Sequence, residues 1–390
     1  MTSSNAPAPP AEAPLTGIRV TQVATYLAGP FVGRVLADLG AEVIEVEAPG
    51  SDRKRSWSWC AVHRGWRSII LDLKTTAGVA VLHDLIRLSD VFVENFRPGV
   101  ADRLGVGYAD LSAVNKRLIY CSVSGFGQWG PLSPLATTDG AVQAFAGALQ
   151  YSGNGTDFGV PLGLPVADLS AGAGGAHAVL AALYARERSG RGCRIDISLA
   201  ESLMNWMRAA GRPGDLAGPP KTLIASAADG KLLLLQAARD NVFRRLVEAL
   251  STAEGCGHLA ADERFATVEA CRANVAAYKA EASAALAKRP AAEWIEILAN
   301  AGVPAGPAQT MAEALLDPHI VERGAFEVVD HPQEGGQFRI PGSPYMIDGR
   351  RLSAQTPPPR FGEHAEAILR EVLGYSANQI TDLRARAVVG

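Results

Sequence analysis

Short apolar runs rich in β-branched residues alternate with amphipathic, helix-like stretches from Gly17 to about Phe126, and this alternation constrains the fold more than any other feature. The stretches 30–39 and 76–88 have helical spacing. The strand-like runs are 17–24, 41–47, 68–73, 91–94 and 118–123. This pattern predicts an α/β fold with a mostly parallel, Rossmann-like sheet covered by helices. Ligands of such sheets bind at the carboxyl ends of the strands, here the loops 28–30, 95–99 and 124–127.

The rest of the chain predicts a second, smaller domain. Segment 211–221 is dense in glycine and proline and is predicted to be a linker. A hairpin turning at Asp229-Gly230 and several helices follow, so 222–325 is predicted to be a small α+β domain. A return linker over 326–334 then leads back to the large domain, which comprises 15–210 and 335–390. An amphipathic helix is expected from Glu363 to about Leu373.

Composition excludes several function classes. The 37 basic and 40 acidic residues are spread along the chain, with Arg53-Lys54-Arg55 as the longest basic block, so a nucleic-acid partner is not expected. Five cysteines without CxxC spacing argue against a disulfide framework and a structural zinc site, and favour a cytoplasmic location. Residues 1–14 are predicted to be a disordered tail. No uninterrupted apolar stretch reaches about 18 residues, so no membrane partner is expected.

Asp168 is the main candidate for chemistry. It ends the proline-marked segment 161–168 and precedes a run of small residues that continues as a helix to about Arg186. We predict that Asp168 is the N-cap of this helix, which would keep its carboxylate ionised and oriented. The glycines that follow would leave the helix end open to a ligand. An ordinary cap with no catalytic role has the same local pattern.

Other motifs separate the remaining alternatives. The turn 28–33 has alanine at the first glycine position of GxGxxG, which disfavours a nicotinamide dinucleotide. The loop 94–99, with Arg103 and Lys74, predicts a basic cleft suited to an adenine-bearing, phosphorylated ligand. No histidine lies in a hydrolase motif, and His177 is expected to be non-catalytic. No set of residues with metal-ligand spacing is present.

Many ordered blocks resemble one known family. In chain order they are 17–20, 27–30, 36–44, 68–74, 90–99, 103–108, 124–131, 190–192, 302–307, 361–364 and 373–376. These blocks are similar to the class III CoA-transferases, the family of formyl-CoA transferase and carnitine CoA-transferase, which also contains α-methylacyl-CoA racemase. The resemblance extends nearly from end to end. It implies an interlocked homodimer and an enzyme without a permanently bound cofactor, for which coenzyme A and acyl-CoA are substrates.

The resemblance also implies roles for individual residues. Asp168 matches the nucleophile that forms a mixed anhydride with the acyl group and then an aspartyl-CoA thioester. Thr138 and Asp139 match positions beside the reacting acyl group. The positions that match CoA contacts are Leu27, Ala28, Leu71, Lys74, Asn95, Phe96, Arg97 and Arg103.

Two departures from the family pattern matter. The racemase branch has a histidine where this chain has Thr138, and threonine cannot carry a proton near neutral pH. The segment 211–220 lacks the glycine run that shields intermediates in formyl-CoA transferase. We therefore expect a CoA-transferase. A racemase, an epimerase or another acyl-CoA-converting enzyme on this scaffold is the first alternative, and a non-catalytic acyl-CoA-binding protein is the second.

The acyl donor and the acid acceptor are not evident from the sequence. The basic block Arg53-Lys54-Arg55 has the charge to bind a phosphate of CoA or the second carboxylate of a diacid, but an exposed basic turn is the simpler explanation for it. A dicarboxylate acceptor is the substrate expectation that this block favours.

Overall fold

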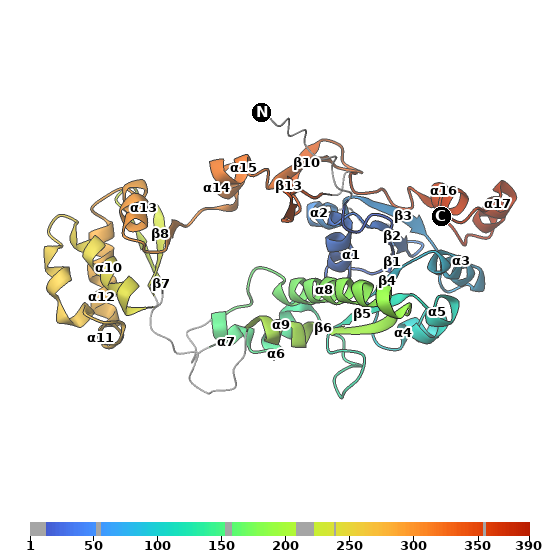
Figure 1. Ribbon diagram of the computed structural model, residues 1–390, viewed down its shortest axis with the longest axis horizontal. Coiled ribbons are helices and arrows are strands. Elements are labelled where there is room, and N and C mark those ends of the chain that lie inside the picture. Colours follow the sequence, from blue (N-terminus) through green and yellow to red (C-terminus); the bar gives the residue numbers. More distant parts are fainter. Residues whose placement is uncertain (1–12, 52–55, 153–157, 208–221, 238, 354–355) are drawn as a thin grey trace, which may run out of the picture. The chain divides into compact units, whose positions relative to one another are not determined.

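The computed structural model describes residues 13–51, 56–152, 158–207, 222–237, 239–353 and 356–390. The chain divides into two units, one built from Met1–Gly211 and Glu322–Gly390 and the other from Arg212–Val321 (Figure 1). Most of the predicted tail, the predicted linker 211–221 and the basic block Arg53-Lys54-Arg55 lie outside the described residues.

A six-stranded sheet forms the centre of the first unit, and all its neighbouring strands are parallel, which confirms the predicted sheet. Its strand order is β3-β2-β1-β4-β5-β6. The strands are β1 (Arg19–Val23), β2 (Glu42–Glu47), β3 (Trp66–Ile70), β4 (Val91–Glu94), β5 (Ile119–Ser124) and β6 (Cys193–Ser198). Parallel neighbours need crossover connections, and the helices between these strands supply them.

Strand residues alternate between two apolar cores, one on each face of the sheet. In β4, Val91 and Val93 pack into the core that contains α1 and α8, whereas Phe92 packs into the core that contains α3 and the C-terminal helices. Side chains on both faces are thus removed from water, which explains why these strands are almost continuously apolar. The helices of this unit up to residue 207 are α1 (Ala28–Asp38), α2 (Trp57–His63), α3 (Thr76–Arg87), α4 (Val100–Arg103), α5 (Tyr108–Val114), α6 (Asp139–Phe145), α7 (Ala148–Ser152), α8 (Val166–Ser189) and α9 (Leu199–Met207).

The glycines of α8 allow close packing against α1. A Cβ atom at Gly172 would lie 2.7 Å from Cβ of Phe31, and one at Gly175 would lie 2.9 Å from Cγ2 of Val32. The sequence prediction assigned these glycines to an open, ligand-accessible helix end, and this was wrong, because neighbouring helix α1 occupies that space. By length and composition α8 could cross a membrane, but its packing against α1, α9, β5 and β6 accounts for its apolar character.

The C-terminal part of the first unit adds small antiparallel pairs and short helices. Segment 326–334, predicted to be a linker, contains strand β10 (Phe326–Asp330), because its backbone pairs with β11 (Gln337–Pro341). The predicted helix 363–373 is interrupted: α16 (Ala365–Ala367) continues as a π-helical turn over Ile368–Val372. The remaining elements are β12 (Met346–Ile347), β13 (Arg350–Arg351) and α17 (Ala377–Ala385).

The C-terminal segment covers the edge strand β3. The Gly362 N–H donates to Ser68 Oγ at 2.8 Å, and the His364 N–H donates to the Ser68 carbonyl at 2.9 Å. Just beyond the two ends of β3, Gly65 N–H donates to the Thr356 carbonyl at 2.8 Å and Asp72 N–H donates to the Val388 carbonyl at 2.9 Å. The Ser68 carbonyl in β3 and the N–H groups of Gly65 and Asp72 beside it are therefore paired with chain that lies far later in the sequence.

A buried ionic cluster joins α1, the turn before β3 and β10. Arg64 is 1% exposed, and its guanidinium lies 2.6 Å from Asp38 Oδ1 and 3.5 Å from Glu327 Oε2. Arg34 adds a longer contact to Asp38 at 3.8 Å and donates to the Pro341 carbonyl at 3.1 Å. Burial of so many charges is tolerated only when each has a partner.

The second unit is a small α+β body with its own core. Strands β7 (Thr222–Ser226) and β8 (Leu232–Gln236) form the predicted antiparallel hairpin, and β9 (Ala305–Pro307) pairs with β8. Leu233, Leu235 and Trp294 are buried in its core. The helices between β8 and β10 are α10 (Asp240–Ser251), α11 (Val268–Ala273), α12 (Val275–Leu286), α13 (Ala291–Asn300), α14 (Met311–Leu316) and α15 (Pro318–Glu322), with 3₁₀ turns over Gly257–Ala261 and Glu263–Phe265.

Candidate active site

Asp168 lies in the first turn of α8, but it is not the cap. The helix begins at Val166, Pro165 occupies the cap position, and no side chain of the cap residue bonds to the helix. Instead, Asp139 Oδ2 accepts the free N–H groups of Ala167 at 2.8 Å and of Asp168 at 3.0 Å. The predicted capping role of Asp168 was therefore wrong, because a carboxylate from α6 already takes the N–H groups that a cap would satisfy.

Asp139 is itself fixed by a neighbour on the same helix. The side-chain amide of Gln143, one turn further along α6, donates to Asp139 Oδ1. This amide also bonds to the chain that precedes Asp168: Leu162 N–H donates to Gln143 Oε1 at 2.9 Å, and Gln143 Nε2 donates to the Leu164 carbonyl at 3.2 Å. The start of α8 is therefore held by a small polar network that originates on α6.

The electrostatic environment of Asp168 differs from the one that the sequence predicted. Burial, followed by the nearby charge of Asp139, raises the pKa of Asp168 from an ordinary value of 3.8 to about 6. Within the described part of the chain, no group donates a hydrogen bond to the Asp168 carboxylate. A partly buried carboxylate without donors is a stronger base and nucleophile than a solvated one, and perturbed acids of this kind are typical of functional sites.

The first turn of α1 approaches α8 one turn beyond Asp168. A Cβ atom at Gly172 would lie 2.8 Å from the carbonyl oxygen of Ala28. Leu27 and Ala28, the first predicted contact residues, are the cap and first residue of α1. The close packing of the two helices thus brings these two residues into the neighbourhood of the candidate nucleophile.

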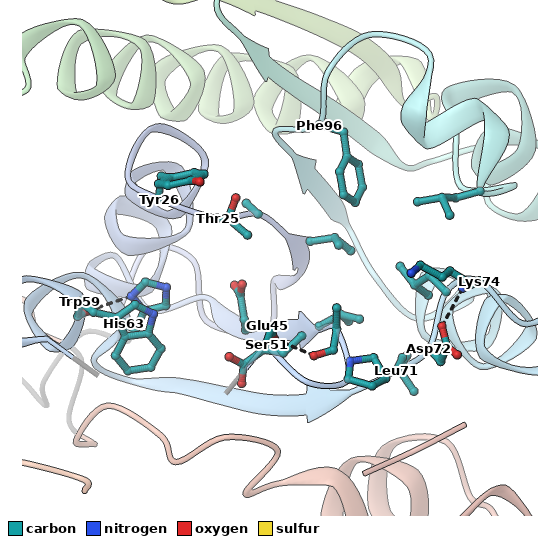
Figure 2. A pocket seen from close by; sticks show the side chains of 18 residues that line it. Thr25, Tyr26, Glu45, Ser51, Trp59, His63, Leu71, Asp72, Lys74 and Phe96 are labelled. Atoms are coloured by element: carbon teal, nitrogen blue, oxygen red, sulfur yellow. Dashed lines mark hydrogen bonds between the residues drawn. The ribbon is translucent and has the colours of Figure 1, made fainter. Parts of the chain in front are cut away.

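A cavity of about 450 Å³ lies at the carboxyl ends of β1, β2, β3 and β4 (Figure 2). Leu71, Lys74 and Phe96, three of the residues predicted to contact CoA, line it. Most of the lining surface is apolar. Lys74 and Asp72 lie on one side of the view in Figure 2, opposite His63 and Trp59. A cavity with an apolar wall and a few convergent polar groups suits a nucleotide-sized ligand.

The other predicted contact residues do not line this cavity. Asn95 donates to the Thr25 carbonyl at 2.7 Å and accepts from the Thr25 N–H at 2.9 Å, so it fixes the loop that forms one wall. Arg97 and Arg103 are exposed outside the lining.

Among the lining residues that sequence reasoning missed are Tyr26, Glu45, Trp59 and His63. The signal for Glu45 was available, because it lies near the carboxyl end of a predicted strand. Trp59 and His63 come from α2, a short helix that the periodicity did not reveal. Tyr26 has a positive φ of 62°, which no sequence pattern indicated.

Thr138 is the cap residue of α6, directly before Asp139, and its side chain makes no capping hydrogen bond. His177 is exposed on α8. Across the described ranges, no group of three or more His, Cys, Asp or Glu side chains could hold a metal ion.

The chain is similar in sequence and in fold to known proteins. Residues 15–365 match the family described as CoA-transferase family III. The succinate–glutarate CoA-transferase of Agrobacterium fabrum is 36% identical over 92% of this chain and 96% of its own length. The acetyl-CoA:oxalate CoA-transferase of Acetobacter aceti is 35% identical over 94% and 97%. The crystal structure of a CAIB/BAIF family protein from Brucella suis superposes with a TM-score of 0.79 at 33% identity, covering 93% of this chain and 100% of that one.

Proposed function

We propose, from the premise that this chain belongs to CoA-transferase family III and is a CoA-transferase, that it moves CoA between carboxylic acids through covalent chemistry at Asp168. The observation that carries the proposal is the Asp168 carboxylate in the first turn of α8, whose pKa is raised to about 6 and which has no hydrogen-bond donor in the described chain. A carboxylate in this state is ionised at neutral pH and poorly solvated, as a nucleophile requires.

In the first half-reaction, an Asp168 oxygen attacks the thioester carbonyl carbon, the C–S bond breaks and CoA thiolate leaves a mixed anhydride. The thiolate then attacks the aspartyl carbonyl carbon, releases the first acid as a carboxylate and leaves an aspartyl-CoA thioester. In the second half-reaction, the acceptor carboxylate displaces the thiolate to form a new anhydride. The thiolate attacks the acceptor's carbonyl carbon, which yields the new acyl-CoA and restores Asp168. No electrons or water are consumed, and the thioester energy is retained.

We propose that the cavity at the carboxyl ends of β1–β4 receives the nucleotide end of CoA. Lys74 supplies a positive charge for a phosphate group, and Phe96 and Leu71 supply apolar surface for the adenine ring.

Replacing Lys74 with methionine is expected to raise the KM for acyl-CoA about tenfold and to change kcat by less than about threefold, because a phosphate contact remote from the reacting bond contributes equally to substrate and transition state. Steady-state kinetics measures both constants. Lys116→Met, which alters an exposed lysine outside the cavity, is the control. An unchanged KM in Lys74→Met would place the nucleotide elsewhere.

We propose a dicarboxylate as one of the two acids. The support comes from the relatives, which are named for succinate, glutarate and oxalate. A screen of mono- and dicarboxylic acids against acetyl-, succinyl- and formyl-CoA, read by mass spectrometry of the CoA products, decides the substrate class. Exclusive use of monocarboxylic acids would contradict this part of the proposal.

We propose a homodimer as the working assembly. The segment that leads to Asp168 exposes several large apolar side chains, which a second copy of the chain would cover. They are Trp129, Leu135, Phe145, Phe158, Val160, Leu162 and Leu164. Light scattering measures the mass in solution, and an active monomer would contradict the assignment.

The covalent step is tested by trapping. With acyl-CoA and hydroxylamine, the enzyme is expected to form a hydroxamate at Asp168, because hydroxylamine attacks both the anhydride and the thioester. Peptide mass spectrometry locates the modification, and a reaction with the free acid in place of acyl-CoA is the control. A protein that only binds acyl-CoA gives no adduct. Exchange of the α-proton into heavy water without an adduct would instead indicate racemase chemistry.

A further inference from the structure

Gln143 is the polar side chain that connects the start of α8 to α6. It is 1% exposed, and its amide oxygen accepts from Leu162 N–H while its amide nitrogen donates to the Leu164 carbonyl and to Asp139. A buried amide with both ends satisfied is held in one orientation, and leaving one of its partners unsatisfied would be costly.

The partners of Gln143 lie on the two segments that determine where Asp168 stands. Leu162 and Leu164 belong to the loop that enters α8, and Asp139 accepts the N–H groups of Ala167 and Asp168. Without the amide, this loop and the Asp139 carboxylate would each lose a fixed partner. The hydrogen bonds of Gln143 go to Asp139, Leu162 and Leu164, and within the described chain none joins it to the Asp168 carboxylate, so we expect Gln143 to act on the nucleophile through these partners.

We propose that Gln143 is a positioning residue, which fixes Asp139 and the Leu162–Leu164 loop so that the Asp168 carboxylate is aimed at the thioester carbonyl. This inference rests on the proposed function, because the orientation of the Asp168 carboxylate affects the reaction rate only if Asp168 is the nucleophile. A displacement of about 1 Å at a reacting atom costs about a hundredfold in rate. Gln143 should therefore affect the formation of the covalent adduct and leave the binding of CoA at the cavity unchanged.

The test compares Gln143→Met, which keeps the volume and removes the hydrogen bonds, with Gln143→Glu, which keeps an acceptor for Leu162 and removes the donor to Asp139. The matched control is Asn115→Leu. Asn115 carries a side-chain amide of the same kind, which bonds to the Ile86 and Ser89 carbonyls in the same unit. Single-turnover formation of the Asp168 adduct and the Kd of CoA are measured for each folded variant.

In both Gln143 variants we expect adduct formation to slow about 10- to 100-fold, with a CoA Kd within about twofold of the wild type because the cavity is untouched. Asn115→Leu should retain the wild-type rate of adduct formation. A wild-type rate in a folded Gln143 variant would overturn the inference, and so would an equal slowing in Asn115→Leu or a parallel loss of CoA binding. Failure of both Gln143 variants to fold, with Asn115→Leu folded, would assign Gln143 a purely structural role. If the wild type forms no adduct, the proposed function fails instead.

Discussion

Asp168→Asn is expected to abolish CoA transfer and, at the same time, to make the folded protein more stable above pH 7. The loss of transfer should exceed about a thousandfold, because an amide cannot act as the nucleophile and the covalent route has no substitute. The gain in stability follows from the state of the wild-type carboxylate, which is ionised, partly buried and close to Asp139.

The direction of the stability change follows from the pKa of Asp168 in the folded protein and in the unfolded chain. Burial and Asp139 raise the pKa of folded Asp168 to about 6, above the ordinary 3.8 of an unfolded chain. Ionised Asp168 therefore opposes folding above about pH 6, and this cost disappears as the pH falls from 6 towards 4. Without solvent screening, the difference between the two pKa values corresponds to a loss of about 3 kcal/mol in the free energy of unfolding. Screening at this partly exposed site reduces it to about 1–2 kcal/mol.

Denaturant unfolding of the wild type and Asp168→Asn at pH 8 and at pH 4 measures this effect. The variant should be more stable at pH 8 and equal in stability at pH 4. The wild-type rate of transfer should fall as the pH drops through about 6, because protonation removes the nucleophile. Asp110→Asn, at an exposed position on α5, is the control and should change neither quantity. Full transfer activity in Asp168→Asn would refute the assignment of the nucleophile.

Arg64→Met is expected to lower the free energy of unfolding by about 3–5 kcal/mol, because it leaves Asp38 buried without its closest partner. Asp38 is 3% exposed, and burial already raises the pKa of its carboxyl group, which Arg64 partly offsets. The Arg34 contact at 3.8 Å is too long to replace the 2.6 Å contact of Arg64. The cost should therefore appear as a loss of stability across neutral pH.

Thermal and urea unfolding of Arg64→Met measures this loss. Adding Asp38→Leu to Arg64→Met should recover part of the stability, because the uncompensated charge is then gone. Arg117→Met is the control: the Arg117–Glu187 pair is exposed at 3.6 Å, and its removal should cost less than about 1 kcal/mol. Equal losses of stability in Arg64→Met and Arg117→Met would show that the buried ionic cluster stabilises the fold no more than an exposed ion pair does.

The sheet could be predicted from sequence because parallel strands buried on both faces leave short apolar runs that stand out from the helices. The residue that caps α8 could not be predicted from the sequence. Asp168 has every local property of a cap residue, but the carboxylate that fills this role is Asp139, 29 residues earlier. Gly172 and Gly175 likewise look like an accessible helix end, and only the position of α1 shows that they provide close packing.

The candidate site was predictable where a residue lies at the end of a predicted strand. Leu71, Lys74 and Phe96 follow β3 and β4 and line the cavity together. Arg97 and Arg103 have suitable charge, but their sequence positions do not fix where their side chains lie. Gln143 gave no sequence signal, because its partners are two backbone groups and a carboxylate that come together only in the folded chain.

The cover of β3 has a consequence for synthesis on the ribosome. Ser68 of β3 bonds to His364, and 296 residues of chain separate them. At a translation rate of about 5–20 residues per second, the outer edge of β3 stays unpaired for about 15–60 s, until the segment that pairs with it has been synthesised. An open strand edge is a template for pairing with other chains. The nascent protein should therefore depend on chaperones during this interval, and the edge of β3 should be protected only after the segment around residues 356–388 has been synthesised.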